Sequence, residues 1–266
     1  KNNLFHAPET YMEKISTKVK EKGVVDLDFS TKENIFNLSE YLNKKPENIT
    51  ACILNRPRHN KIITELTETA QRFELSVAKV IITSGDGGRG YSRQGCLTSN
   101  VIISFHPFPT HYDALQQQGI HLGVSSLKLG VSPLTAGIKH LNRLEQVLIR
   151  QELDNRSEDD LLVLNCFDNI IEASAANVFW LKNDIWYTPQ LTDSGVEGLM
   201  RNHILKICSN HCEIKLVNAK LSALDGIDAM FICNSVMGIM PVKYFERQIL
   251  SLAPCYDIKE RLQGVM

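Results

Sequence analysis

The stretch LLVLNCFDNIIEASAANVFWLKNDIWYTP, residues 161–189, decides the fold class of this chain. It holds four short runs rich in leucine, isoleucine, valine and aromatic residues, with the polar groups FDN and KND between the runs. Short apolar runs separated by such groups are typical of β-strands joined by tight turns. The stretch therefore predicts a β meander of four strands.

Further elements flank the meander on both sides. Three more β-rich runs lie upstream, and they are VAKVIITSG at 77–85, NVIISFHPFP at 100–109 and HLGVSSLKLG at 121–130. Downstream we expect a helix from about Val196 to Asn210, strands at EIKLV and DAMFIC, and a terminal helix near Ile258 to Leu262. Between the third run and the meander, LNRLEQVLIRQEL predicts a helix with one buried apolar stripe, formed by Leu141, Leu144, Val147 and Leu148.

The first 70 residues alternate short strands and helices. The runs are VVDLD, ENIFNLSEYLNKK, ITACILN and KIITELTETAQRF, an order that suggests a small α/β unit. A chain of 266 residues fits about two domains at roughly 150 residues each. Residues 107–116, with Pro107 and Pro109, are the best candidate hinge. We therefore expect an α/β (α+β) protein with a small α/β domain at residues 1–110 and a larger β-rich domain with flanking helices at 111–266.

Charge and hydropathy exclude some classes of partner. The chain has 29 Lys and Arg against 30 Asp and Glu, whereas nucleic-acid binding needs a concentrated cationic surface. No apolar run approaches the ~20 residues that span a bilayer, and the opening KNNLFHAPETYMEK has no apolar signal region. We expect a cytoplasmic protein with a small-molecule substrate, and neither a nucleic-acid nor a membrane partner.

The seven cysteines are odd in number and scattered, which indicates reduced thiols rather than a disulfide framework. One cluster, His203, Cys208, His211 and Cys212, resembles a set of metal ligands. These residues interrupt an amphipathic helix, whereas structural zinc usually takes close Cys or His pairs on turns. We therefore expect no metal.

Two ionisable residues stand in apolar surroundings. Lys139, in SPLTAGIKHLNRLEQ, could form a Schiff base with a carbonyl if its amine is desolvated, although a solvated surface charge is the common role of such a lysine. Glu172 lies within the apolar run IIEASAANVFW, and alternation puts it on one strand face with Ile170 and Ser174. A buried carboxylate needs a cation or a proton donor, so Glu172 either pairs with a nearby Arg or Lys or holds a protonated ring nitrogen.

Three polar segments are candidates for ligand binding. In TDSGVEGLMRNHILKIC, the start of a helix near Gly195 and Gly198 offers free N–H groups that suit a phosphate. Asn234 and Ser235 in CNSVMGIMPV could add hydrogen bonds to that phosphate. The turn GDGGRGYS presents Arg89, which could clamp a carboxylate. Ordinary caps and turns remain the alternative in all three cases.

Five motifs together closely resemble the 4-amino-4-deoxychorismate lyase family of fold type IV pyridoxal-phosphate enzymes. They run in order from about residue 65 to the end, and they are GGRGYS at 87–92, TAGIKHLNRLEQVLIR at 135–150, EASAANVFW at 172–180, SGVEGLMR at 194–201 and CNSVMGIMPV at 233–242. The KHLNRLEQVLIR run favours the lyase over the branched-chain and D-amino-acid aminotransferases, which share the fold and remain the alternative.

The resemblance implies a role for each candidate. Lys139 would hold pyridoxal 5'-phosphate as a Schiff base and later move protons, and Glu172 would keep the pyridine nitrogen protonated. The phosphate would be bound by Leu199, Met200, Asn234 and Ser235. Arg89 and Tyr91 would meet a substrate carboxylate. The implied reaction converts aminodeoxychorismate to 4-aminobenzoate and pyruvate for folate synthesis, in a homodimer.

The first 65 or so residues resemble a different family, the class II fructose-1,6-bisphosphatases. The resemblance is carried by LFHAPETYMEKISTKVKEKGVVDLDF and ITACILNRPRHNKIITEL, in which Tyr11, Arg56 and Arg58 match residues near the sugar phosphate. The metal-binding carboxylates of that family are absent from this sequence, so no phosphatase activity is expected. The arginine with which fold type IV enzymes grip the cofactor phosphate is also missing. An inactive hybrid that only binds a phosphorylated ligand is therefore a third reading.

Overall fold

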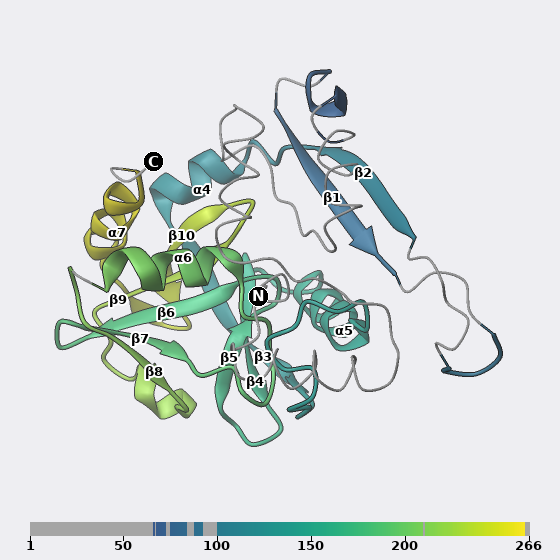
Figure 1. Ribbon diagram of the computed structural model, residues 1–266. Helices are drawn as coiled ribbons and strands as arrows, with labels where there is room; N and C mark the ends of the chain where they lie inside the picture. Colours follow the sequence, from purple (N-terminus) through teal and green to yellow (C-terminus); the bar gives the residue numbers. More distant parts are fainter. Residues whose placement is uncertain are drawn as a thin grey trace. The chain divides into compact units, whose positions relative to one another are not determined.

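A computed structural model describes residues 66, 68–72, 75–83, 88–92, 100–209 and 211–263 of the chain (Figure 1). The chain divides into two compact units, Lys1–Pro109 and Thr110–Met266, and each is described by itself. Within the described ranges, no helix is long and apolar enough to cross a membrane. The elements expected at VVDLD, ENIFNLSEYLNKK and ITACILN lie outside the described residues, as do Tyr11, Arg56 and Arg58.

The first unit contains an antiparallel pair of strands. Strand β1 (Ser76–Ile82) pairs with β2 (Val101–Pro107), with Val80 opposite Ile103. These strands match the first two of the three β-rich runs predicted upstream of the meander. Residues 68–70 are helical, as expected for the end of KIITELTETAQRF.

The second unit is built on one mixed, curled sheet. Its strands are β3 (Ile120–Leu129), β4 (Asp160–Asn165), β5 (Ile170–Ala173), β6 (Asn177–Lys182), β7 (Ile185–Pro189), β8 (Ile214–Val217), β9 (Ala229–Asn234), β10 (Gly238–Phe245) and β11 (Gln248–Ile249). The strand order is β5-β4-β3-β10-β9-β6-β7-β8, with β11 paired to β10. Strand β3 runs parallel to both β4 and β10, and β7 runs parallel to β8.

Four helices belong to this unit. They are α4 (Tyr112–Gln118), α5 (Leu144–Leu153), α6 (Leu199–Cys208) and α7 (Ala253–Gln263). A short 3-10 helix, η2, covers Leu221–Leu224. Helix α4 was not expected, because its sequence lies in the segment interpreted as a hinge.

The four strands of the predicted meander form where they were expected, but the predicted pairing of each strand with the next is wrong. Strands β4 and β5 pair antiparallel, and so do β6 and β7, yet β6 pairs with β9 instead of β5. The pairing of β6 with β9 aligns two apolar strands over five residue pairs, from Asn177 opposite Cys233 to Leu181 opposite Ala229. The turn at KND is tight as predicted, with Asn183 and Asp184 both at positive φ, the signature of a two-residue hairpin turn.

The two faces of the sheet bury different groups of side chains. Along β6, Val178 and Trp180 enter the large inner core, while Phe179 and Leu181 enter a core shared with α6 and α7. Phe179 stacks on Phe231 of β9, with ring centroids 4.9 Å apart. This alternation is what a strand covered on both faces requires.

Helix α5 packs on β3 and β4 through residues other than those predicted. Its buried residues are Ile149 and Leu153, whereas Leu144 and Val147 are 67% and 60% exposed. Leu141 and Leu148 are exposed as well. The expected buried stripe is therefore wrong for this unit, because the helix turns a different face to the sheet.

A β-bulge in β5 changes the direction of Glu172. Leu162 lies opposite Ala173 and Val163 opposite Glu172, but Leu164 lies opposite Ile170, so Ile171 is an extra residue. The extra residue breaks the alternation of the strand. Ile170 and Ala173 both enter the inner core, and Ile171 joins Val163 and Ile149 of α5 in a separate cluster. The predicted face, Glu172 with Ile170, is therefore wrong: Glu172 shares the α5 face with Ile171.

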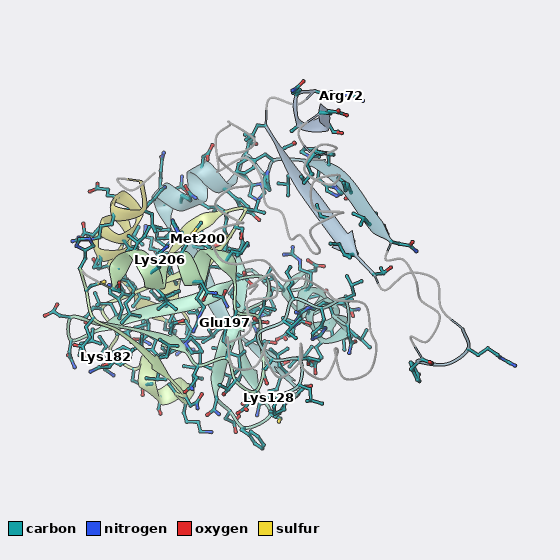
Figure 2. The ribbon with its side chains drawn as sticks, in the orientation of Figure 1. Arg72, Lys128, Lys182, Glu197, Met200 and Lys206 are labelled. Atoms are coloured by element: carbon teal, nitrogen blue, oxygen red, sulfur yellow. The ribbon has the colours of Figure 1, made fainter. Side chains whose placement is uncertain are left out.

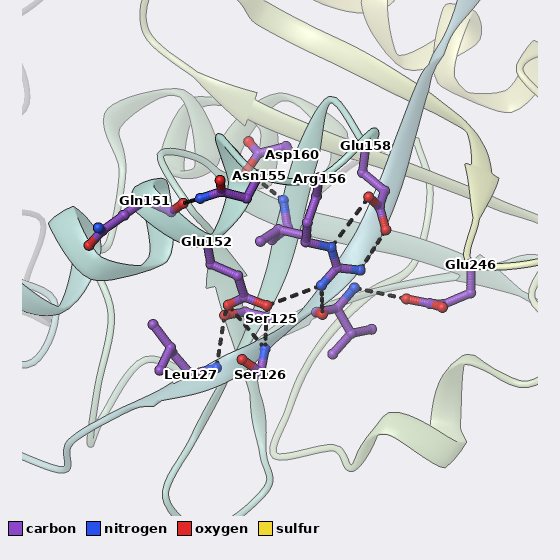
Figure 3. Close-up of polar contacts among 12 residues, drawn as sticks. Ser125, Ser126, Leu127, Gln151, Glu152, Asn155, Arg156, Glu158, Asp160 and Glu246 are labelled. Carbon is purple, nitrogen blue, oxygen red and sulfur yellow. Dashed lines mark hydrogen bonds and ion pairs between the residues drawn. The ribbon is translucent and has the colours of Figure 1, made fainter.

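An ionic network anchors the C-terminal end of α5 to β3 (Figure 3). Arg156 pairs with Glu152 at 3.1 Å and with Glu158 at 2.5 Å, and it donates to the carbonyl of Val124 at 2.8 Å. Glu152 also accepts bonds from the Ser125 hydroxyl at 2.7 Å and from the Ser126 N–H at 2.9 Å. These two serines lie where β3 departs from regular pairing with β4. Glu152 thus satisfies backbone and hydroxyl groups that the ladder leaves unpaired.

We predict that Glu152→Ala lowers the free energy of unfolding by roughly 1–3 kcal/mol, because it leaves half-buried donors without an acceptor. The control is Asp154→Ala on the same helix, which breaks the exposed Arg150–Asp154 pair and should cost at most ~1 kcal/mol. Urea unfolding followed by fluorescence of Trp180 and Trp186, both in this unit, measures the difference. Equal losses in the two variants would contradict the prediction.

Candidate active site

Lys139 lies in the loop that connects β3 to α5. The N–H of His140 donates to the carbonyl of Ile138 at 3.0 Å, so Lys139 is the central residue of a three-residue turn. Just before it, Gly137 forms a parallel bridge with Val196: the Gly137 N–H donates to the carbonyl of Gly195 at 2.9 Å. The Lys139 turn is therefore tied directly to the segment that precedes α6.

Glu172 is buried, with 6% of its surface exposed, and it accepts a hydrogen bond from the Val196 N–H at 2.8 Å. Burial raises the pKa of this carboxyl, while the Val196 N–H and the charges of Arg143 and Lys139 act to lower it. Gly195 packs closely against this carboxyl and has a positive φ of 84°. A Cβ atom on residue 195 would lie 2.5 Å from Ile171 Cγ2 and 3.2 Å from Glu172 Oε2. Only glycine permits this approach.

Asn177 joins the same segment to β6, and the sequence interpretation missed it. Its side-chain Nδ2 donates to the carbonyl of Val196 at 2.6 Å, and its Oδ1 accepts from the Gly198 N–H at 3.0 Å. A Cβ on Gly198 would lie 2.3 Å from that oxygen, so a larger residue at position 198 would displace the Asn177 side chain. The available signal was one asparagine beside the apolar run VFWL, which did not by itself indicate a site.

Leu199 and Met200 are the first two residues of α6, directly after its N-cap Gly198. The N-cap has no side chain to accept from the helix, and the first N–H groups of a helix have no partner within it. Figure 2 labels Met200 and Glu197 at this end of the helix and Lys206 in its last turn. Helix starts of this kind are common binding places for anions, and the phosphate site at this one remains a prediction.

A buried arginine that sequence reasoning missed holds α6 in place. Arg201 is 1% exposed, and its guanidinium donates to Glu197 at 3.2 Å and to the carbonyl of Pro189 at 2.9 Å. Burial lowers its pKa, and Glu197 counteracts that effect. Its Nε is buried with no hydrogen-bond partner in the described part of the chain. The contacts fix the first turn of α6 against the end of β7.

Asn234 and Ser235 lie at the turn between β9 and β10. The Asn234 side chain accepts from the N–H groups of Val236 and Met237, both at 2.9 Å, and donates to the carbonyl of Ala175 at 3.1 Å. Asn234 therefore shapes the turn that presents Ser235. The bond to Ala175 brings this turn beside the start of β6, where Asn177 contacts the α6 segment.

The contacts bring six of the predicted residues into one region of the second unit: Lys139, Glu172, Leu199, Met200, Asn234 and Ser235. The other two belong to the first unit, where Arg89 and Tyr91 are exposed.

At the cysteine and histidine cluster, the Cys212 thiol lies 3.7 Å from the Cys208 carbonyl, and burial raises the pKa of Cys208 to about 12. The described residues contain no group of three or more His, Cys, Asp or Glu able to hold a metal ion.

Comparisons with known proteins identify the family and the fold of the chain. The family described as Amino-transferase class IV matches residues 30–245, which begins upstream of the boundary near residue 65 that the motifs indicate. The chain is 36% identical over 242 residues to an aminodeoxychorismate lyase from Vibrio harveyi, covering 89% of each chain. The structure of a 4-amino-4-deoxychorismate lyase from Pseudomonas aeruginosa superposes with a TM-score of 0.72 at 29% identity, covering 77% of each chain.

Two further matches concern the aminotransferases and the N-terminal segment. A branched-chain amino acid aminotransferase from Escherichia coli shares the fold with a TM-score of 0.70 at 19% identity, covering 88% of this chain and 77% of that one. The N-terminal segment is 39% identical over 75 residues to a D-fructose 1,6-bisphosphatase class 2/sedoheptulose 1,7-bisphosphatase from Synechocystis, covering 28% of this chain and 22% of that protein. Both predicted resemblances are confirmed. The chain belongs to the class IV amino-transferase family and has the fold type IV architecture.

Proposed function

We propose that this chain is a pyridoxal-phosphate-dependent lyase that converts 4-amino-4-deoxychorismate to 4-aminobenzoate and pyruvate. The observation that carries the proposal is the joint placement of Lys139, the buried Glu172 and the first turn of α6 through Val196. The identity of 36% to a lyase over most of the chain supports the same reaction. We further propose that residues 111–266 form the cofactor-binding domain and residues 1–110 the smaller domain.

The residues of this region fit pyridoxal phosphate. A buried carboxyl with a raised pKa suits a cationic ring nitrogen, because the cation stabilises the ionised form. The first turn of α6, with glycine at its N-cap, suits a phosphate. When bound, the cofactor supplies an electron sink for charge that develops on the substrate. Lys139 supplies the amine to which its carbonyl carbon binds.

Each residue then has one task in the reaction. Lys139 Nζ would hold the cofactor, and as an amine released from it Lys139 would accept the proton that leaves the substrate ring. Glu172 holds the proton on the ring nitrogen. Leu199 and Met200 bind the phosphate through their N–H groups, and Asn234 and Ser235 complete that binding site. Cleavage of the C–O bond that joins the enolpyruvyl group to the ring would then release enolpyruvate, which takes up one proton to become pyruvate, and the ring that has lost its proton to Lys139 would become aromatic.

The substrate carries carboxylates that need cationic partners. Arg89 can bind a carboxylate through two parallel hydrogen bonds, and Tyr91 can donate a third. We propose these two residues of the first unit for that role because of their place in GGRGYS.

An aminotransferase is the second candidate, because the family match and the shared fold with branched-chain aminotransferases favour it. Both reactions use the same lysine and carboxylate. The products distinguish them: the lyase releases pyruvate from aminodeoxychorismate, whereas an aminotransferase passes the amino group to 2-oxoglutarate.

We also propose a cytoplasmic homodimer. Free thiols at the described cysteines support a reducing location, and they are Cys166, Cys208, Cys212, Cys233 and Cys255. Three exposed apolar residues of α5 and one just before the helix support a dimer, because exposed apolar groups of this kind often mark protein contacts. They are Leu144, Val147 and Leu148 of α5, and Leu141.

We predict that borohydride reduction of the chain loaded with pyridoxal phosphate leaves a pyridoxyl group on Lys139, located by peptide mapping. Lys139→Ala should lose both this label and the release of pyruvate from aminodeoxychorismate. Lys128→Ala, which removes an exposed lysine paired with Asp168, should keep both. No label on Lys139 would overturn the proposal. Labelling with amino transfer to 2-oxoglutarate and no pyruvate would establish the aminotransferase, and labelling with neither would establish an inactive hybrid.

We predict that Glu172→Gln alters how the stability of the cofactor-free chain depends on pH. Because burial raises the folded-state pKa of Glu172, its protonated form stabilises the fold below the ordinary value of 4.5, and that contribution is lost as pH rises through the folded-state pKa. Wild type should therefore lose stability relative to Glu172→Gln as pH rises above the ordinary value of 4.5, by at most ~1.4 kcal/mol per pH unit. Urea unfolding of both proteins tests this, and a constant difference would contradict it.

We predict that Leu144→Asp converts the dimer to a monomer, because a charge in a buried apolar contact is costly. Sedimentation equilibrium at micromolar concentration measures the mass against the 30.0 kDa of one chain. Leu216→Asp places the same charge at an exposed leucine of β8, away from the exposed apolar residues at α5, and should leave the dimer intact. A monomeric wild type would refute the homodimer.

A further inference from the structure

We propose that Arg143 is a positioning residue that holds Lys139 in register with the phosphate-binding end of α6. The inference rests on the proposed function, because it assigns Lys139 and α6 to one cofactor. Arg143 lies four residues after Lys139, at the N-cap of α5. It contacts the backbone on both sides of that lysine.

The Arg143 guanidinium donates hydrogen bonds to two backbone carbonyl groups, one before and one after Lys139 in the chain. Its Nη2 donates to the carbonyl of Ile138 at 2.9 Å, and its Nε donates to the carbonyl of His140 at 3.1 Å. The first carbonyl belongs to the peptide group that joins Ile138 to Lys139, and the second belongs to the peptide group that follows His140. A planar guanidinium presents such donors in a fixed fork, so one side chain fixes the peptide group directly before the lysine and another peptide group one residue beyond it.

Arg143 is itself held in place by α5. Its carbonyl accepts from the Val147 N–H at 3.1 Å, and the helix is anchored by Ile149 and Leu153 in the core. The opposite side of the Lys139 turn is fixed by Gly137, through the bonds to Gly195 and Glu197 at 2.9 and 3.1 Å. The segment 195–197 leads without interruption into Gly198 and α6. Arg143 thus fixes the C-terminal side of the Lys139 turn. The N-terminal side of the turn is joined through Gly137 to the segment that leads into α6.

Electrostatics favour the same arrangement. Burial lowers the pKa of Arg143, while the charges of Glu172 and Glu145 raise it. In return, Arg143 lowers the pKa of Glu172. Burial lowers the pKa of His140, and the charge of Arg143 lowers it further. Arg143 and Lys139 thus both act electrostatically on the Glu172 carboxyl.

A lysine cannot replace this function. An ammonium on a flexible stem keeps the charge but has no planar fork, so it cannot hold both carbonyls in one geometry. The variant Arg143→Lys therefore separates position from charge, and Arg143→Met removes both. Arg150→Lys on the same helix is the control, because Arg150 is exposed and pairs only with Asp154 among the bonds described.

The test compares the rates at which pyridoxal phosphate and pyridoxal attach to Lys139, followed by the absorbance of the bound cofactor. Both reagents offer the same carbonyl, so a change in the basicity of Lys139 or in folding affects both rates alike. The ratio of the two rates reports whether the Lys139 amine is placed correctly relative to the proposed phosphate site at the start of α6. We expect Arg143→Lys and Arg143→Met to lower this ratio about tenfold or more, and Arg150→Lys to leave it unchanged.

A second measurement needs no cofactor. Amide hydrogen exchange at residues 138–140 should accelerate in both Arg143 variants, because the turn opens more often once the two carbonyls are released, while exchange in β4 stays at the wild-type rate. Faster exchange together with no cofactor attachment to wild type would refute the proposed function, and with it the positioning role, and would leave Arg143 only as a residue that stabilises the turn at residues 138–140. An unchanged rate ratio, or unchanged exchange at residues 138–140, in a folded Arg143→Lys would overturn the inference.

Discussion

The hydrogen bond from the Val196 N–H to the buried Glu172 is the interaction on which the site depends. A buried carboxylate is costly unless donors and cations surround it, so the loop before α6 must lie directly on β5. That same loop bridges to Gly137 on one side and continues into α6 on the other. One buried carboxyl thus determines where the Lys139 turn lies and where the helix begins.

The sequence allowed prediction of features that depend on local pattern. The strand runs, the KND turn, Lys139, Glu172 and the glycine-rich start of α6 all rest on residue types within a few positions of one another. Strand pairing and the buried face of α5 depend on partners distant in the chain, so β6 beside β9 could not be derived. An amphipathic pattern indicates that a face is covered, and it does not identify what covers it.

Three features of the site escaped prediction for related reasons. The bulge at Ile171 arises from how β5 pairs with β4, and nothing in IIEAS marks the extra residue. Asn177 and Arg201 are an asparagine beside an apolar strand and an arginine in a helix, which are ordinary residue types in those places. Their importance comes from the groups they meet, the Val196 carbonyl and the Pro189 carbonyl, and both lie in other segments.

The bulge at Ile171 also places a constraint on chain length. Between the turn at Asp168 and Glu172, the number of residues sets which face of the sheet the carboxyl meets, because successive strand residues point to opposite sides. If β5 kept its length but paired regularly onward from Ile170 opposite Leu164, Ile171 would lie opposite Val163 and Glu172 would point into the apolar inner core, away from Val196, with every side chain otherwise intact. The extra residue is therefore what directs the carboxyl to Val196, so the length of this segment and the presence of the bulge have to change together.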